Sequence, residues 1–235
     1  MVSNRHCKFS KFSQTISGLG YSASLYDSAL FIQCTSRGII LLLLYIDDMI
    51  ITEDDLMGIQ DLKQFLNLRF EMKDLGPLSY FLGFEITTSI DGYYLTQAKY
   101  VSNVLSKSGL TDSKIVDTPL ECNTRLNLHD GKSLRDGTSY HQLMSGLLYL
   151  NVTHPNISHV VHIASQFMIA PRSTHFVVIH RIFRYLKGTM FYGLHFSSQS
   201  LLILRAYSNA DQAGDPTDRY STIGYCFFLG DSLIS

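Results

Sequence analysis

The pattern of apolar and polar residues is most pronounced between residues 39 and 51, which read IILLLLYIDDMII. A short apolar run is interrupted by two adjacent carboxylates, Asp47 and Asp48, and then resumes. Apolar runs of this length on both sides of turn-forming acids predict two buried strands joined by a tight turn. A membrane-spanning helix would need roughly 20 apolar residues without charges, and this run is too short for one.

The two acids at the tip of this predicted hairpin permit two interpretations. Asp is a common turn residue, so the pair could mark a plain turn. Neighbouring like charges repel each other, however, and they become favourable when a divalent cation lies between them and the phosphates of a substrate. The pattern therefore favours a catalytic metal site at the tip over a plain turn.

The remainder of the chain alternates between helical and strand periodicity, which predicts an α+β fold. Helices are expected at residues 9–19, 53–69, 97–109, 140–150, 157–168 and 173–187. Further strands are expected at residues 29–32, 80–88, 93–96, 201–208 and 220–229. Residues 116–138 are polar and contain two Asp-Gly pairs, so we expect a long connection there.

Composition and charge add few constraints. The formal net charge is −1, so any nucleic-acid binding must come from local basic patches. The four cysteines are far apart in sequence, which is typical of free thiols in a reducing compartment and indicates neither a disulfide nor a zinc site. No secretory signal is visible at the amino terminus. We therefore expect an intracellular protein that is neither secreted nor membrane-bound.

The hairpin also carries a family resemblance. Tyr45-Ile46-Asp47-Asp48 resembles the Tyr-x-Asp-Asp box of reverse transcriptases. Blocks in the expected order extend the resemblance over essentially the whole chain: EMKDLGPLSYFLGFEI, LTQAKYVSNVL, VDTPL, RIFRYLKGT and AGDPTDRYSTIGYCFFLG. The sequence is similar to the polyproteins of copia-type retrotransposons.

The resemblance implies an organisation in three parts. Residues 1–115 correspond to a partial polymerase palm with the antiparallel catalytic hairpin and the primer-grip region. Residues 116–197 correspond to a linker and a helical thumb or connection, and residues 198–235 to a truncated ribonuclease H-like start. It further implies that Asp47 and Asp48 are catalytic metal ligands, and that Tyr45, Leu82 and Gly83 contact the substrate.

The implied reaction is RNA-directed DNA synthesis, with an RNA template, an RNA–DNA duplex and deoxynucleoside triphosphates as partners. It requires two metal ions, Mg²⁺ or alternatively Mn²⁺. The family supplies a third carboxylate from an earlier strand, whereas Asp27 is the only acid before Asp47 here and lies in a different block. We expect the isolated chain to be inactive, because this acid and the fingers are missing.

Two further positions bear on function. Asn209 stands where the ribonuclease H pattern has a metal-binding carboxylate, which predicts that ribonuclease activity is absent. In the predicted helix at 173–187, Arg181, Arg184 and Lys187 fall on one side, with His180 beside them. The resemblance to a thumb or connection favours contact with a nucleic-acid duplex over a solvated basic face.

Other functions remain as alternatives. The chain could be a non-catalytic nucleic-acid-binding protein or a vestigial one. A metal-dependent hydrolase that uses Asp47 and Asp48 has little support, because no base or nucleophile pattern accompanies the pair.

Overall fold

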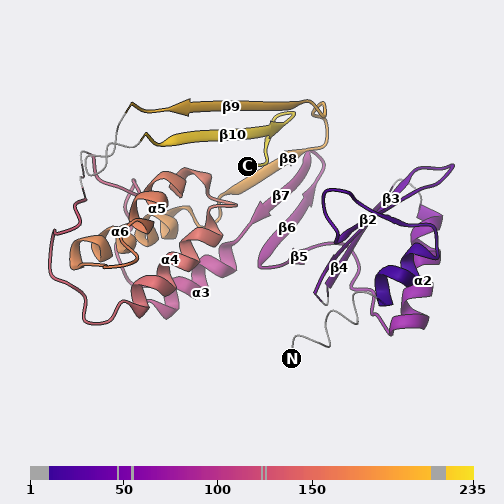
Figure 1. Cartoon of the computed structure of the whole chain (residues 1–235), viewed down its shortest axis with the longest axis horizontal. Coiled ribbons are helices and arrows are strands. Elements are labelled where there is room, and N and C mark those ends of the chain that lie inside the picture. The colour runs from indigo at the N-terminus through magenta and orange to yellow at the C-terminus, as the bar shows by residue number, and fades with distance from the viewer. Residues whose placement is uncertain (1–10, 47, 54–55, 123, 125, 213–220) are drawn as a thin grey trace. The chain divides into compact units, whose positions relative to one another are not determined.

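The computed structural model describes residues 11–46, 48–53, 56–122, 124, 126–212 and 221–235. Helices and antiparallel sheets form the α+β fold that the sequence predicts. The chain divides into two compact units, Met1–Leu78 and Ser79–Ser235 (Figure 1). The boundaries at residues 115 and 197 that the family resemblance implies stay predictions.

The first unit is built on an antiparallel sheet of four strands in the order β1-β2-β3-β4. Its strands are β1 (Ser22–Ala23), β2 (Leu30–Cys34), β3 (Ile39–Tyr45) and β4 (Asp48–Glu53). The predicted hairpin at 39–51 is confirmed, because β3 and β4 pair in register from Leu44 opposite Met49 to Leu41 opposite Thr52.

Two helical segments supply the core of this unit. Residues 11–17 are helical, and α2 spans Leu56–Phe70. One face of the sheet contributes Phe31, Ile40 and Leu42, which are buried together with residues of both helices. These helical residues are Phe12, Ile16, Leu62 and Leu66. Burial of one sheet face fixes the strand register, since a slip by one residue would turn the apolar side chains outward.

The second unit contains a sheet of four strands in the order β5-β6-β7-β8. They are β5 (Tyr80–Phe81), β6 (Phe84–Ser89), β7 (Gly92–Thr96) and β8 (Gly193–Ser197). The prediction of one continuous strand at 80–88 is wrong. Leu82 and Gly83 have φ values of 49° and 82°, so the chain turns back there and β5 pairs with β6 as a hairpin.

Strand β8 was not predicted from the sequence. It pairs antiparallel with β7, about a hundred residues earlier, with Gly193 opposite Thr96. A Cβ atom at Gly193 would lie 2.1 Å from the carbonyl oxygen of Leu95, so the strands approach closely where no side chain intervenes. The sequence of this strand gives no signal of so distant a partner.

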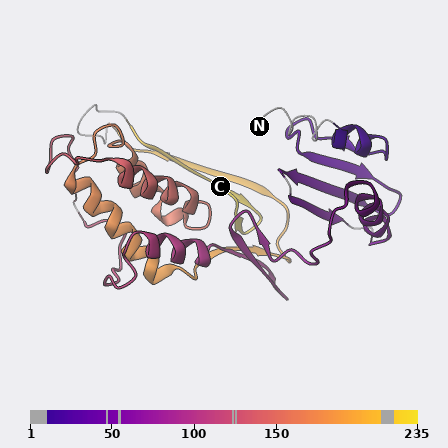
Figure 2. The same ribbon diagram turned by 90° about the horizontal axis from the view of Figure 1, so that it is seen from below.

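Four helices form the core of the second unit, and Figure 2 shows them gathered beside one another. They are α3 (Ala98–Lys107), α4 (Thr138–Leu150), α5 (Ser158–Ser165) and α6 (Ser173–Thr189), with a 3-10 turn at Pro155–Ile157 before α5. The expected apolar side of α6 is confirmed, because Ile179, Ile182, Phe183 and Leu186 are all buried.

A three-stranded sheet with the order β11-β10-β9 completes the description. Its strands are β9 (Leu204–Ala210), β10 (Ile223–Leu229) and β11 (Ser232–Leu233). Every residue of β9 is exposed. Within the described ranges, the structure contains no helix long and apolar enough to cross a membrane.

Candidate active site and candidate nucleic-acid interface

The tip of the β3–β4 hairpin is exposed above an apolar base. Tyr45 at the end of β3 lies opposite Asp48 at the start of β4. Of this predicted pair of acids, Asp47 lies outside the described residues, and Asp48 is exposed. Tyr45 and Ile46 are 46% and 59% exposed, whereas Leu42 is fully buried below them.

Ile46 adopts an unusual backbone conformation for its residue type. Its φ is 55°, in the left-handed region that a β-branched residue rarely occupies. Strain of this kind costs on the order of 1–3 kcal/mol and is concentrated at functional sites. The strained turn holds the side chain of Asp48 at the end of the sheet, out of the core.

Oxygen ligands for a hard cation are present at this tip. A carboxylate such as that of Asp48 is the ligand type that Mg²⁺ prefers. Within the described residues, no three His, Cys, Asp or Glu side chains come together as a metal site. Asp48 therefore has the right chemistry, and the other ligands of a complete site would have to come from Asp47 and from groups outside the described set.

Asp27 lies near the same end of the sheet. Strand β2 begins beside the end of β3, since the amide of Leu44 donates to the carbonyl of Ala29 at 2.9 Å. One carboxylate oxygen of Asp27 accepts a hydrogen bond from the amide of Ala29, also at 2.9 Å. This contact gives Asp27 a turn-forming role just before β2.

The predicted primer-grip residues, Leu82 and Gly83, form the β5–β6 turn in the second unit. A side chain approaches this turn from α4, because a Cβ atom at Gly83 would lie 2.9 Å from the hydroxyl of Tyr149. The hydroxyl of Tyr149 therefore lies where a side chain at residue 83 would have to fit, and the contact of Leu82 and Gly83 with a primer stays a prediction.

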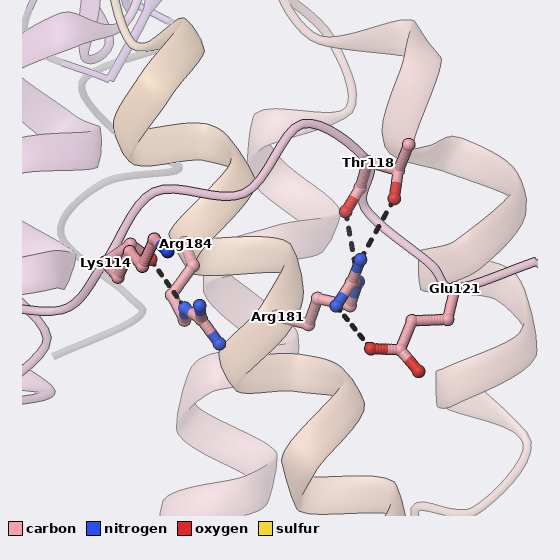
Figure 3. Close-up of polar contacts among 5 residues, drawn as sticks. All are labelled: Lys114, Thr118, Glu121, Arg181 and Arg184. Atoms are coloured by element: carbon pink, nitrogen blue, oxygen red, sulfur yellow. Dashed lines mark hydrogen bonds and ion pairs between the residues drawn. The ribbon is translucent and has the colours of Figure 1, made fainter.

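The three cations of α6 donate to a distant part of the same chain. Arg181 donates Nε to the carbonyl of Thr118 (3.2 Å), one Nη to the hydroxyl of Thr118 (3.1 Å) and the other to Glu121 (2.6 Å). Arg184 donates Nε to the carbonyl of Lys114 at 2.6 Å. Figure 3 shows both guanidinium groups directed at residues 114–121.

Lys187 continues the same arrangement. Its ammonium donates to the carbonyls of Thr111 and Ser113, the latter at 2.8 Å. We call residues 111–121 the strap, and Arg181, Arg184 and Lys187 the cation row. Burial lowers the pKa of the neighbouring His180, so this imidazole adds no charge to the row at neutral pH.

The contact continues towards the beginning of α6. The carbonyls of Asn127, Asp130 and Gly131 are bonded by the side chains of His175, Thr174 and Arg172, respectively. The contacts therefore follow α6 in the antiparallel direction, from Thr111 beside Lys187 to Gly131 beside Arg172, and the described part of the predicted connection lies along this helix. That the row binds nucleic acid stays a prediction, since its donors meet the strap in this structure.

The predicted ribonuclease H position, Asn209, lies in β9 opposite Gly224 and is exposed. The first part of the block that follows it, residues 213–220, lies outside the described residues.

Comparison with known proteins agrees with the sequence pattern. Residues 3–122 match the family model described as reverse transcriptase (RNA-dependent DNA polymerase). The chain is 37% identical over 92% of its length to the retrovirus-related Pol polyprotein from transposon RE2 of Arabidopsis thaliana. It is 33% identical over 97% of its length to that from transposon TNT 1-94 of Nicotiana tabacum.

The chain spans only 15% and 18% of these two polyproteins. A shorter relative, an uncharacterized mitochondrial protein of Arabidopsis thaliana, is 38% identical over 83% of the chain and 80% of its own length. No solved structure matches the chain. The similarity in sequence and the family model show that this chain belongs to the reverse transcriptases of copia-type retrotransposon polyproteins.

Proposed function

We propose that this chain carries the catalytic hairpin of an RNA-directed DNA polymerase. The observation that carries the proposal is the exposed tip at Tyr45, Ile46 and Asp48, with a strained backbone at Ile46, on a buried apolar hairpin. Such a tip presents carboxylates at the end of a rigid sheet, where a primer terminus and a nucleotide can approach them.

Asp47 and Asp48 would hold the metal ions, for which Mg²⁺ is the best match and Mn²⁺ an alternative. Bound divalent ions stabilise the attacking and leaving oxygens in phosphoryl transfer. Tyr45 would contact the substrate beside the carboxylates. Leu82 and Gly83, at a turn with two positive φ values, would contact the primer strand.

The three-part organisation is part of the same proposal. Residues 1–115 act as a partial palm, residues 116–197 as linker and thumb or connection, and residues 198–235 as a ribonuclease H-like start. The template is RNA, the product an RNA–DNA duplex, and the substrate a deoxynucleoside triphosphate. With the neutral amide of Asn209 at a metal-ligand position, the last part does not cleave RNA.

We further propose that a protein of these 235 residues does not polymerise by itself. Asp27, the only acid before Asp47, is used in a turn. Two carboxylates then remain for a chemistry that commonly needs three, and loss of a metal ligand lowers the rate by orders of magnitude.

The test combines two primer-extension assays on a primed RNA template. The purified chain with Mg²⁺ or Mn²⁺ should show no extension, and extension that vanishes in Asp47→Ala/Asp48→Ala would prove it active. In the second assay, residues 39–53 replace the corresponding hairpin of an active copia-type polymerase. The chimera should extend the primer, and the double alanine variant should not. A dead chimera that folds would contradict the proposed role of the hairpin.

A second candidate function is nucleic-acid binding without catalysis. The observation that favours it is the cation row, whose three positive charges lie on one side of a rigid helix. Neutralising the row should then weaken binding to an RNA–DNA duplex and reduce its salt dependence by about one counterion per lost phosphate contact.

A further inference from the structure

We propose that the strap is an autoinhibitory segment, which occupies the cation row and must leave before a nucleic-acid phosphate backbone can bind there. The proposal rests on the nucleic-acid binding proposed above. It adds that a segment of the same chain competes with the nucleic acid for the cation row.

The first argument is the chemistry of the contact. The cation row meets only oxygen acceptors on the strap: four backbone carbonyls, one hydroxyl and one carboxylate. Phosphate oxygens are acceptors of the same kind and carry more negative charge, so they compete for the same donors.

The second argument is charge. The strap contains Asp112, Asp117 and Glu121 against a single cation, Lys114, so its net charge is −3 + 1 = −2. It lies along three cations of the helix. An acidic segment on a basic helix face resembles a nucleic-acid strand in its charge.

The third argument is that the polar contacts at the row are open to water. Arg181 retains 22% exposure and Glu121 68%, so water reaches their ion pair and salt screens it. Asp112, Lys114 and Asp117 of the strap are exposed as well. Two apolar contacts accompany the polar ones, because Leu120 packs against the helical core and the side chain of Ile115 lies close to Gly188. Opening the strap therefore breaks water-exposed polar contacts and these two apolar ones, whereas Ile182 and Leu186 belong to the buried side of α6.

The competition sets the apparent affinity. When a ligand can bind only to molecules whose strap is open, its apparent affinity is the intrinsic affinity multiplied by the fraction of open molecules. Variants that weaken only the strap side of the contact should therefore bind nucleic acid more tightly, although no phosphate-binding group has been changed.

The binding experiment uses the full chain and a fluorescent RNA–DNA hybrid duplex. Thr118→Val/Glu121→Gln removes the hydroxyl acceptor of Thr118 and the negative charge of Glu121, and it keeps the cation row. We expect its affinity for the duplex to rise about three- to tenfold, the equivalent of one ordinary hydrogen bond. Asp117→Asn changes the charge by the same amount as Glu121→Gln at an exposed site of the same strap, and it should leave the affinity nearly unchanged.

A cleavage experiment reports strap opening without relying on affinity. The carbonyl of Lys114 accepts the hydrogen bond from Arg184 and belongs to the Lys114–Ile115 bond that trypsin cuts. Duplex, or the variant Arg184→Ala, should accelerate cleavage at this bond. Cleavage at Arg37–Gly38, in the other unit, serves as the internal reference.

The possible results separate the two proposals. The strap proposal would be wrong if duplex binds while Lys114–Ile115 stays protected and Thr118→Val/Glu121→Gln binds with unchanged affinity. Nucleic-acid binding would still stand in that case. If neither the native chain nor the loosened variant binds duplex, both proposals are wrong. Should the double variant fail to fold, the single variant Glu121→Gln provides the same comparison, with Asp117→Asn as its charge-matched control.

Discussion

Thr153 donates its hydroxyl hydrogen bond to Oε1 of Gln97 at 2.7 Å, although 56 residues separate them in sequence and both are buried. The same hydroxyl lies 3.0 Å from Nδ1 of His154, whose Nε2 lies 3.2 Å from the carbonyl of Thr189. Nε2 of Gln97 is buried and has no hydrogen-bond partner among the described residues. These contacts tie the beginning of α3 to the end of α6.

The direction of these hydrogen bonds depends on the charge of His154. While Thr153 donates to Gln97, both ring nitrogens must donate, and His154 is an imidazolium. A neutral ring requires the amide of Gln97 to turn over, so that its Nε2 donates to Thr153 and Thr153 donates to Nδ1. Burial lowers the pKa of His154, against the opposing hydrogen bond to Thr189, and so favours the neutral arrangement.

The first prediction is a loss of stability in acid. Because the pKa of His154 is lower in the folded chain than its ordinary 6.5, the unfolded chain takes up the proton first as pH falls. The stabilisation that the neutral His154 gives to the folded chain is complete above pH about 6.5. It is lost as the pH falls through the pKa of His154 in the folded chain. The melting temperature should therefore decrease as the pH is lowered from 7.5 to 5. His154→Gln should reduce the slope, and His129→Gln, at an exposed site, should not.

The second prediction concerns Gly83. Its φ is 82°, and a Cβ atom would meet the hydroxyl of Tyr149. Gly83→Ala should cost about 1–2 kcal/mol of unfolding free energy for the backbone alone. Gly109→Ala is the matched control, because its φ is 68° and the space around it is open. Denaturant melts should show a larger loss at Gly83, and Tyr149→Phe should reduce the excess. Equal losses would mean that Tyr149 does not restrict this turn.

The third prediction distinguishes geometry from charge in the cation row. Arg181 uses three nitrogens on two partners, which an ammonium cannot reproduce. Arg181→Lys should therefore lower the unfolding free energy by about 1–2 kcal/mol, although the charge is kept. Arg184→Lys should cost less, since Arg184 is held by a single bond from Nε. The reverse order in denaturant melts would contradict this account of the strap contact.

The sequence predicted the elements whose information is local. The acids between two apolar runs predicted the β3–β4 hairpin. The helical spacing of Ile179, Ile182 and Leu186 predicted the buried side of α6. The sequence predicts one strand at 80–88 where the structure has β5 and β6, because Leu82 is apolar and only the single Gly83 indicates a turn. The partner of β8 and the strap could not be predicted, since both depend on contacts between residues far apart in the chain.

The fourth prediction concerns the stability of the hairpin tip. Asp48 is exposed next to a second acid, so neutralisation removes repulsion and breaks no core contact. Asp48→Asn and Asp47→Asn should each leave the melting temperature unchanged or slightly raised. A loss of several degrees would show that the acids are structural.

The most direct test of the hairpin tip as a catalytic metal site is a Mn²⁺ titration of the isotopically labelled chain, followed by NMR. Paramagnetic broadening should begin at the amide signals of Tyr45, Ile46, Asp48 and Met49, and Mg²⁺ should reverse it by competition. The same titration of Asp47→Asn/Asp48→Asn should leave these signals sharp. Broadening that appears only elsewhere, or that persists at the tip in the double variant, would contradict the assignment.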